Sequence, residues 1–236
     1  NTDLTCVPSR GTAQALNQFG VTCPLVVVGR GVDPDTFSPK WRSPDLRYAW
    51  GVSNETRVML YVGRLSPEKE IDVLIKTYFV LRQVHQQDIR LVVVGDGPDR
   101  TRLQQLNQDG SIVFTGSLTG EKLSAAYASA DVFCFASQVE TFGNVVLEAM
   151  ASGLPVIAYD YACASLHVQH GETGWLSRLG HQQGLIQQML GLPDLQRLQQ
   201  MGAQARKKAE KVGWQYPVRQ FEQALYSLVQ HQEYRI

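Results

Sequence analysis

Short runs of β-branched and other apolar residues alternate with longer amphipathic stretches along most of this 236-residue chain. The runs that predict strands are Val58–Val62, Leu91–Val94, Ile112–Phe114, Val132–Phe135 and Val156–Ala158. Each run is apolar at consecutive positions, which is typical of a strand buried on both faces of a parallel sheet. The pattern predicts an α/β fold with a doubly wound, Rossmann-like parallel sheet, in which ligands bind at the carboxyl ends of the strands.

The segments between these runs carry helix signals. Apolar residues recur near the helical period from Ile71 to His85. Pro98 suits the first turn of a helix, and Thr119 is a candidate cap for a helix that ends at Ala130. A helix from Asn144 to Ser152 would end at Gly153, because glycine commonly follows the last helical turn.

Both ends of the chain depart from this alternation. Leu4–Val7 and Leu25–Val28 predict strands on either side of a helix from Ser9 to Phe19. A polar, proline-rich connection follows over residues 31–50. From Gln182 onward we expect helices almost throughout, with Pro193 and Pro217 opening successive ones.

Composition excludes several classes of protein. The 22 Lys and Arg residues balance 22 Asp and Glu residues, which argues against a nucleic-acid-binding protein that relies on bulk charge. No apolar run approaches the roughly 18 residues of a membrane span. The chain begins at Asn1 without an initiator Met or an apolar leader, so we expect a piece of a longer protein without a signal peptide.

The four cysteines are scattered, which supports neither a metal site nor a disulfide framework. We expect reduced thiols in a cytoplasmic protein, with Cys134 and Cys163 acting as small hydrophobic residues.

Gly95–Arg100 is a glycine-rich turn after a predicted strand, as in dinucleotide-binding proteins, but its sixth position is Arg instead of Gly or Ala. The turn after the first long strand, Gly63–Glu70, is more informative because it places Arg64 and Lys69 at a carboxyl edge. A guanidinium fork beside an ammonium group suits a diphosphate. The alternative is a pair of solvated surface cations.

Two carboxylates are expected near the carboxyl end of another predicted strand, Val132–Phe135. Glu140 lies in the loop after the strand, and Glu148 lies on the next helix, four residues after Asn144 and on the same face. The backbone N–H groups of Phe142, Gly143 and Asn144 begin that helix and face the same space. Paired carboxylates indicate either acid/base hydrolysis or two sets of hydrogen bonds from sugar hydroxyls. Glu148 stands among apolar residues, where a buried carboxylate needs a partner or a ligand.

The run Glu140–Val156 (ETFGNVVLEAMASGLPV) and the run Gly63–Lys69 (GRLSPEK) resemble the retaining nucleotide-sugar glycosyltransferases of family four, which have the GT-B fold. The Gly31-Val32-Asp33 linker and the later GDGP, FTG and GETGW sequences occur in the order of that family. The resemblance implies the C-terminal half of a GT-B protein with extra C-terminal helices. Its parts would be a remnant of the acceptor domain (1–23), a first strand and interdomain linker (24–55), the donor-binding domain (56–212) and a C-terminal helix (213–236).

The resemblance also implies roles for the residues singled out above. Arg64 and Lys69 would hold the donor diphosphate. Glu140, as the catalytic residue, would hold the hydroxyls of the transferred sugar together with the N–H groups of Phe142, Gly143 and Asn144. Glu148 would accept hydrogen bonds from the ribose hydroxyls, and the backbone around Thr115 and Gly116 would line the edge of the nucleobase site. No metal and no cofactor is required in such enzymes.

The implied function is transfer of a hexosyl group from a UDP- or GDP-sugar to a glycan or lipid-type acceptor held by the preceding domain. The chain alone is expected to bind the donor without catalysing transfer. The alternatives are a non-catalytic sugar-nucleotide-binding module and another GT-B enzyme, such as a sugar-nucleotide epimerase or a phosphorylase. No lysine here has the context of a pyridoxal-phosphate lysine.

Some residues depart from the family or leave alternatives open. Glu70 stands where the family often has Gly, and it either adds negative charge near the phosphates or points outward. Asp160–His167 replaces a Gly-Gly turn, as in a bacterial subgroup that acts on lipid-type acceptors. His167 and His170 are either acid/base groups or surface and capping residues. The basic run Arg206–Lys208 with Lys211 offers peripheral contact with the inner face of a membrane, or is a solvated helix face.

Overall fold

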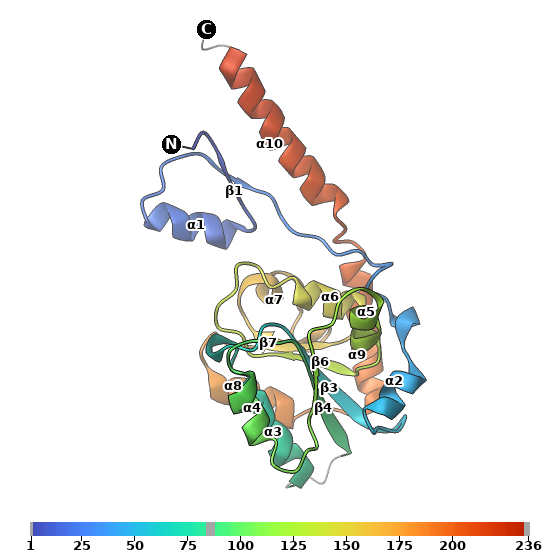
Figure 1. The fold of residues 1–236 in the computed structure, drawn as a ribbon. Helices are drawn as coiled ribbons and strands as arrows, with labels where there is room; N and C mark the ends of the chain where they lie inside the picture. Colours follow the sequence, from blue (N-terminus) through green and yellow to red (C-terminus); the bar gives the residue numbers. More distant parts are fainter. Residues whose placement is uncertain (1, 84–87, 234–236) are drawn as a thin grey trace.

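The computed structural model describes residues 2–83 and 88–233 (Figure 1). The strands in these residues are β1 (Thr5–Val7), β2 (Leu25–Val27), β3 (Arg57–Val62), β4 (Ile89–Val94), β5 (Val113–Gly116), β6 (Val132–Phe135), β7 (Val156–Tyr159) and β8 (Gly174–Ser177). The helices are α1 (Arg10–Gln18), α2 (Pro44–Ala49), α3 (Ile71–Gln83), α4 (Arg100–Leu106), α5 (Gly120–Ala128), α6 (Val145–Ala151), α7 (Ala162–His167), α8 (Gln182–Leu190), α9 (Leu195–Ala209) and α10 (Gln215–Glu233). Two short 3-10 helices, η1 (Pro39–Trp41) and η2 (Pro67–Lys69), complete this set of elements.

Six strands form one parallel sheet in the order β5-β4-β3-β6-β7-β8. The central strands are buried on both faces, and every residue from Val58 to Tyr61 and from Val132 to Cys134 is fully inaccessible to solvent. Consecutive apolar side chains therefore fill both faces, as the sequence predicts for a parallel sheet. The predicted doubly wound α/β fold is confirmed.

The helices cover the two faces of this sheet. α3 contacts α4 and α8 on one face, whereas α6 contacts α5, α7 and α9 on the other (Figure 1). Crossovers between parallel strands are almost always right-handed, and the chain builds outward from β3 in one direction and from β6 in the other, so the two sets of helices are expected on opposite faces. The loops at the carboxyl ends of the strands consequently share one edge of the domain.

Several predicted boundaries were wrong. β5 begins at Val113 instead of Ile112 and runs on to Gly116, next to a register shift at Val93/Val94 of β4. Thr119 has the extended backbone of a cap, but its side chain makes no capping hydrogen bond. Pro98 and Pro193 precede their helices, which begin at Arg100 and Leu195. Positions 84 and 85 of the predicted 71–85 helix lie outside the described residues.

Some elements were missing from the prediction. β8 extends the sheet beyond β7, and the proline-rich segment 31–50 contains η1 and α2 instead of being only a connection. Ser38 and Ser43 cap these two short helices through their hydroxyl oxygens, and a proline follows each serine at the first helical position. Short local motifs of this kind order the connection.

The N-terminal segment forms a separate two-stranded parallel sheet of β1 and β2, joined by α1. Ser9 caps α1 by accepting a hydrogen bond from the N–H of Thr12, as the predicted start of this helix requires. The chain passes between this segment and the large domain twice, and there Gly31 packs directly against the backbone of Gly213. Any Cβ at Gly31 would lie 2.7 Å from the carbonyl carbon of Gly213, so the two passages fit together only with glycine.

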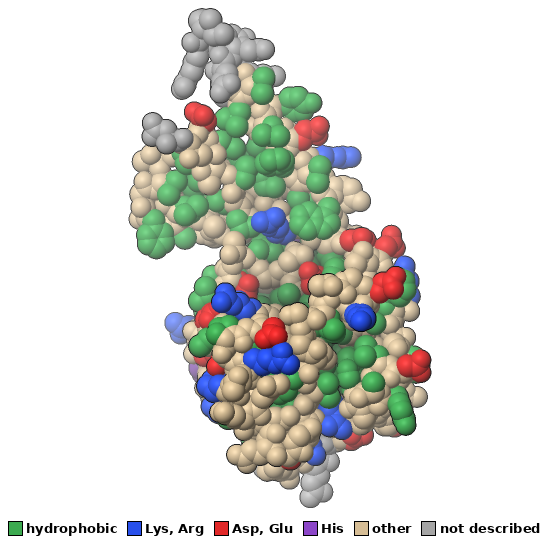
Figure 2. Space-filling model, viewed as in Figure 1, with side chains coloured by type: hydrophobic (Ala, Val, Ile, Leu, Met, Phe, Trp, Pro, Cys, Tyr) green, Lys and Arg blue, Asp and Glu red, His purple; other side chains and the backbone are tan. Residues whose placement is uncertain are grey.

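α10 extends from the large domain alongside the N-terminal segment (Figure 1). Large apolar side chains stay exposed along it and gather in the upper part of the surface (Figure 2). They are Tyr216, Val218, Phe221, Leu225, Tyr226 and Val229, with Trp214 just before the helix. Within the described residues, no helix combines the length and hydropathy that a membrane-spanning segment needs.

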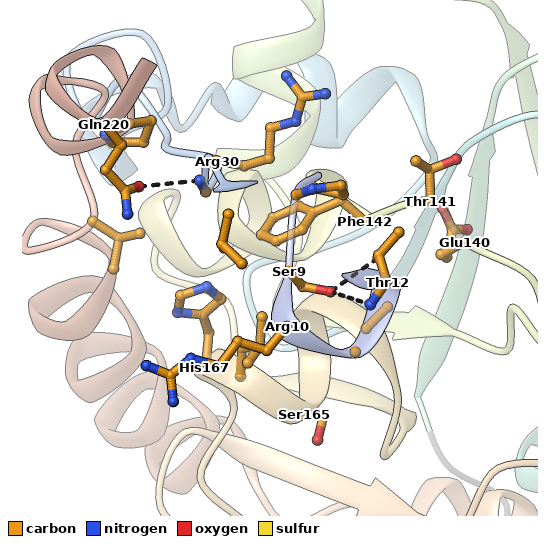
Figure 3. A pocket seen from close by; sticks show the side chains of 18 of the residues that line it. Ser9, Arg10, Thr12, Arg30, Glu140, Thr141, Phe142, Ser165, His167 and Gln220 are labelled. Carbon is orange, nitrogen blue, oxygen red and sulfur yellow. Dashed lines mark hydrogen bonds between the residues drawn. The ribbon is translucent and has the colours of Figure 1, made fainter. Parts of the chain in front are cut away.

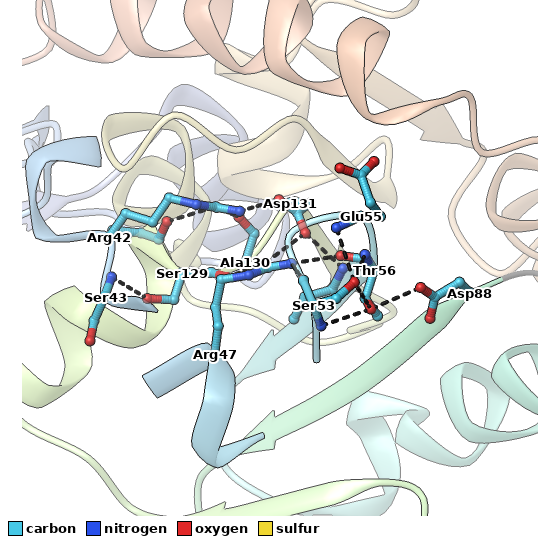
Figure 4. A network of polar contacts seen from close by, with 12 residues as sticks. Arg42, Ser43, Arg47, Ser53, Glu55, Thr56, Asp88, Ser129, Ala130 and Asp131 are labelled. Atoms are coloured by element: carbon cyan, nitrogen blue, oxygen red, sulfur yellow. Dashed lines mark hydrogen bonds and ion pairs between the residues drawn. The ribbon is translucent and has the colours of Figure 1, made fainter. Parts of the chain in front are cut away.

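A buried ion-pair network ties the linker to the sheet (Figure 4). Asp131, just before β6, accepts hydrogen bonds from Arg42 (2.9 Å), Arg47 (3.0 Å) and the N–H of Val58 (2.8 Å). The side chains of Arg47 and Asp131 are each only 3% exposed. Arg47 also donates to the carbonyl oxygens of Ser53, Thr56 and Ser129. Because this charge pair is bonded so extensively inside the protein, α2 is fixed to the domain.

The basic run near the end of α9 is partly engaged within the protein. Arg206 donates to the carbonyl oxygens of Pro34, Phe37 and Ala151 at 2.6–2.8 Å. Lys208 donates to Gln169 (2.9 Å). Arg206 therefore holds the linker against α6, a role that neither membrane contact nor a solvated helix face includes. Lys207 and Lys211 are exposed.

Cys134 and Cys163 are buried, and burial raises the pKa of both thiols. Both were predicted to act as small hydrophobic residues, which is confirmed. Cys6 is exposed and Cys23 is half-buried, and both are free.

Candidate functional site

The predicted site residues lie at the carboxyl edge of the six-stranded sheet. Arg64 and Lys69 follow β3, and Glu140–Asn144 follows β6, the neighbouring strand at the centre of the sheet. The strand order reverses between β3 and β6, since β4 and β5 lie beyond β3 while β7 and β8 lie beyond β6. Such a switch point leaves a crevice in which open α/β sheets bind their ligands.

Glycines let the turns at this edge lie against one another. A Cβ on Gly95 would overlap the carbonyl oxygen of Gly63, and one on Gly97 would overlap that of Leu65. The N–H of Gly95 also donates to the carbonyl oxygen of Gly116 (2.9 Å), which places the end of β5 in the same group of turns. Close packing of these turns accounts for the glycines of Gly95–Arg100, so a dinucleotide-binding role is not needed to explain them.

Lys69 and Glu140 form an ion pair across the switch point. The Lys69 ammonium donates to Glu140 Oε1 (2.5 Å), to the carbonyl oxygen of Val139 (2.9 Å) and to Ser137 Oγ (3.2 Å). The side chains of Lys69 and Glu140 are only 14% and 16% exposed. Lys69 is therefore not a solvated surface cation. Arg64 is exposed, and its guanidinium group makes no hydrogen bond or ion pair with the part of the chain that the structure describes.

The loop from Glu140 to Asn144 presents unpaired backbone donors. Gly143 has a positive φ of 86°, which turns the chain sharply into α6. The N–H groups of Phe142, Gly143 and Asn144 donate no hydrogen bond within the described residues. α7 fixes the loop from below, because Cys163 donates its N–H to the carbonyl oxygen of Phe142 (2.8 Å) and the Tyr161 hydroxyl donates to that of Glu140 (3.2 Å).

Glu148 lies on the face of α6 that begins with Asn144, as the spacing predicts. Its Oε2 accepts a hydrogen bond from the Tyr127 hydroxyl (2.9 Å), and Asn144 Nδ2 lies 3.5 Å from its Oε1. Burial raises the pKa of Glu148, and these two hydrogen bonds oppose the rise. The carbonyl oxygen Oδ1 of Asn144 is buried and has no hydrogen-bond partner among the described residues. A buried orphan acceptor next to a half-satisfied carboxylate is what a site prepared for donor groups would show.

Tyr127 belongs to this site and was not predicted from the sequence. It lies on α5, where it packs edge-on against Phe37 and beside Phe133. Its apolar surroundings give the same pattern as any core aromatic residue, so sequence spacing carries no signal for its hydroxyl. Burial and the neighbouring Glu148 raise the pKa of Tyr127, which therefore stays a hydrogen-bond donor.

A cavity of about 980 Å³ adjoins Glu140. The start of α1, the loop from Glu140 to Phe142, α7 and the start of α10 form its walls (Figure 3). Arg10 and Arg30 from the N-terminal segment contribute cationic side chains to this lining, which is otherwise mostly apolar. No sequence pattern indicates this cavity, because its walls come from segments as far apart in the chain as Gly29 and Gln220.

The two histidines have packing roles in the structure. The His167 ring stands edge-on to Phe142 at the end of α7, where burial lowers its pKa, with a further contribution from Lys208. His170 Nδ1 accepts the N–H of Leu176 (3.1 Å) and so closes the turn before β8. Across residues 2–83 and 88–233, no three His, Cys, Asp or Glu side chains are grouped as metal ligands.

Known proteins of one family resemble this chain. The family model for group 1 glycosyl transferases matches residues 43–208. Sulfoquinovosyl transferase SQD2 of Arabidopsis thaliana is 36% identical over 221 residues, covering 90% of this chain and 42% of that protein. A GDP-mannose-dependent alpha-mannosyltransferase of Mycobacterium tuberculosis is 43% identical over 159 residues, covering 67% of this chain and 39% of that protein. The chain thus spans about two fifths of the length of these curated relatives.

Solved structures share the fold. Sucrose-phosphate synthase from Thermosynechococcus elongatus superposes with a TM-score of 0.80 at 24% identity, over 98% of this chain and 59% of that one. HepE from Anabaena, solved with UDP-glucose, gives a TM-score of 0.80 at 24% identity, over 97% of this chain and 64% of that one. The sheet order, the superpositions and the family model agree, and the chain belongs to the group 1 glycosyl transferases, with the GT-B type of fold.

Proposed function

We propose that the chain binds a nucleoside diphosphate hexose as the donor-binding half of a retaining hexosyltransferase. The observation that carries this proposal is the pairing of Lys69 with Glu140 across the switch point. One cation and one carboxylate held together at this edge provide for the two chemically different parts of a sugar donor, the diphosphate and the hydroxyl-bearing ring.

Each group has a role that matches its surroundings. Arg64 and Lys69 would hold the diphosphate and stabilise its charge as it departs, together with the unpaired N–H groups that begin α6. Glu140 and the N–H groups of residues 142–144 would hold the hexose hydroxyls. Glu148 would accept the ribose hydroxyls, and Thr115 and Gly116 would edge the base, because the end of β5 packs into the same group of turns.

The ion pair favours hydroxyl binding over a general-acid role for Glu140. Lys69 pairs with the ionised form of Glu140, and an ionised carboxylate accepts hydrogen bonds instead of delivering a proton to a leaving group. Burial makes Glu148 more basic than an ordinary carboxyl group, but its nearest partner is the Tyr127 hydroxyl, a donor that already uses one of its oxygens. The pair of carboxylates therefore supports recognition of two sets of hydroxyls.

The donor in this proposal is a UDP- or GDP-sugar. HepE was solved with UDP-glucose, and the mycobacterial relative is named as GDP-mannose-dependent. The acceptor is a glycan or a lipid-type molecule held by the remainder of a longer protein. We propose that the chain alone binds the donor without transferring its sugar.

Isothermal titration calorimetry of the chain with UDP, GDP and ADP tests the proposal. We expect saturable binding of UDP or GDP, and a loss of at least tenfold in Lys69→Ala, since one charge-assisted contact with phosphate contributes about 1.5–3 kcal/mol. Lys76→Ala is the matched control, because Lys76 is exposed on the surface of α3 and, among the described residues, its ammonium pairs with Asp72 alone.

Two results would contradict the proposal. The site assignment is wrong if Lys69→Ala binds nucleotide as well as Lys76→Ala does. Sugar transfer from UDP-glucose or GDP-mannose by the chain alone would show that it is a complete catalyst and not only a donor-binding half.

A further inference from the structure

Glu70 adopts a backbone conformation that its side chain disfavours. It ends the short helix η2 with φ 46° and ψ 39°, in the left-handed region where glycine is preferred. A residue with a side chain persists in this region when its surroundings determine the conformation. The carboxylate of Glu70 is therefore the place to look for what holds it.

Three donors from three other segments converge on that carboxylate. Gln138 Nε2 donates to Oε1 (2.5 Å), the Tyr159 hydroxyl donates to Oε2 (2.7 Å), and Gln182 Nε2 lies 3.5 Å from Oε1. Gln138 follows β6, Tyr159 ends β7, and Gln182 begins α8. An ionised carboxylate accepts at both oxygens and donates at neither, so it matches this set of donors in a way that an amide cannot. Glu70 thus points into the domain, so the alternative that it points outward is wrong.

The same turn and loop are joined a second time around the proposed site. The N–H of Gln138 donates to the carbonyl oxygen of Glu68 (3.0 Å), and the Lys69 ammonium donates to Val139 and Glu140. The turn that carries Lys69 and the loop that carries Glu140 are consequently linked by the Lys69 ammonium, by the N–H of Gln138 and by the carboxylate of Glu70.

We infer that Glu70 is a positioning residue for the donor: its carboxylate holds the loop after β6 against the turn after β3 and so sets the spacing between Lys69 and Glu140. The inference rests on the proposed function, because that spacing matters only if the two groups hold neighbouring parts of one ligand. Glu70 takes no chemical part in the reaction and does not contact the donor. Its effect is to keep Lys69 aimed at the diphosphate while Glu140 faces the sugar.

Glu70→Gly and Tyr159→Phe remove the two ends of this contact. Glycine suits the left-handed backbone at position 70, so the first variant removes the carboxylate and relieves backbone strain together. Phenylalanine removes only the hydroxyl of Tyr159. Glu68→Ala is the matched control, since Glu68 is an exposed carboxylate on the same turn whose side chain bonds only to Ser66 within the described residues.

The measurement is the ratio of affinities for UDP over UMP, and for GDP over GMP, by calorimetry on the whole chain. Loss of one hydrogen bond typically weakens an equilibrium about fivefold, so we expect the diphosphate affinity to fall about fivefold in Tyr159→Phe and about tenfold or more in Glu70→Gly. The monophosphates should change little, because they do not extend to Lys69, and Glu68→Ala should resemble the wild type.

A residue with a purely structural role would lower both affinities or the thermal midpoint and leave the ratio unchanged. That result in Glu70→Gly and Tyr159→Phe overturns the inference while the proposed function stands. If the wild-type chain binds none of the four nucleotides, the proposed function fails and the inference fails with it. Should Glu70→Gly not fold, Tyr159→Phe decides by the same ratio.

Discussion

Glu148→Gln is the substitution for which the structure gives the sharpest expectation. A carboxylate offers about four acceptor positions. The Tyr127 hydroxyl occupies one of them at 2.9 Å, and Asn144 lies at the limit of a hydrogen bond, 3.5 Å away. At least two positions are thus left for the two ribose hydroxyls. Glutamine keeps one oxygen and loses the charge, so at least one charge-assisted hydrogen bond is lost.

The size of the effect follows from that count. A hydrogen bond to a charged group contributes about 1.5–3 kcal/mol, which corresponds to a loss of roughly 10- to 150-fold in nucleotide affinity. Burial raises the pKa of Glu148, which means that the ionised carboxylate is disfavoured in the folded state. The Glu148→Gln substitution should therefore leave the protein at least as stable, and a lower affinity would not reflect unfolding.

A double-mutant cycle tests the contact itself. The chain and its Glu148→Gln variant are each titrated by calorimetry with UDP and 2′-deoxy-UDP, or with the guanosine pair if GDP binds better. We expect the deoxynucleotide to bind more weakly than the ribonucleotide to the wild type and nearly equally to the variant, with a coupling energy above about 1 kcal/mol. Independent losses that simply add would refute the ribose assignment.

Three further outcomes are expected. Glu140→Gln should lose most of the additional affinity that UDP-glucose or GDP-mannose has over the free diphosphate, and an unchanged difference in calorimetry would remove Glu140 from the sugar site. Asp131→Ala should lower the free energy of unfolding in urea by about 3–5 kcal/mol because it leaves Arg47 buried without a counter-charge, whereas Lys76→Ala, at an exposed pair, should cost less than about 1 kcal/mol. The raised pKa of Glu148 gives a pH dependence of opposite sign for binding and for folding. Nucleotide affinity should fall as pH decreases through this pKa, because the accepting carboxylate is lost. The contribution of Glu148 to stability is fully present below the unfolded pKa and is lost as pH rises through the folded pKa. Both trends should be absent in Glu148→Gln, as titrations and urea unfolding between about pH 4 and pH 8 will show.

The strands that the sequence predicts well are those whose burial is complete. Val58–Val62 of β3, Leu91–Val94 of β4, β6 and β7 are continuous apolar runs, and a run of that kind has few other stable environments. β8 was missed because Gly174 and Ser177 flank only two apolar residues, so its four residues lack the pattern of a buried strand. The helix starts at Arg100 and Leu195 were misjudged because Pro98 and Pro193 lie just before the caps instead of inside the first turn.

In the candidate site, too, some residues could be predicted from the sequence and others could not. Glu140 and Glu148 could be found because one loop and one helix carry both, and local spacing fixes their common face. Their partners could not be found from spacing. Tyr127 reaches Glu148 from a different helix, and Tyr159 reaches Glu70 across 89 residues of sequence. Such contacts depend on how the parallel strands are ordered in the sheet, and the order is set by packing of the whole domain.

One nucleotide should lie across the switch point, and a crystal structure of the chain with UDP or GDP tests this most directly. We expect the diphosphate against Arg64, Lys69 and the N–H groups that begin α6, and the ribose hydroxyls on Glu148. A nucleotide seated elsewhere, with Lys69 still paired to Glu140 and no ligand atom at Glu148, would contradict it.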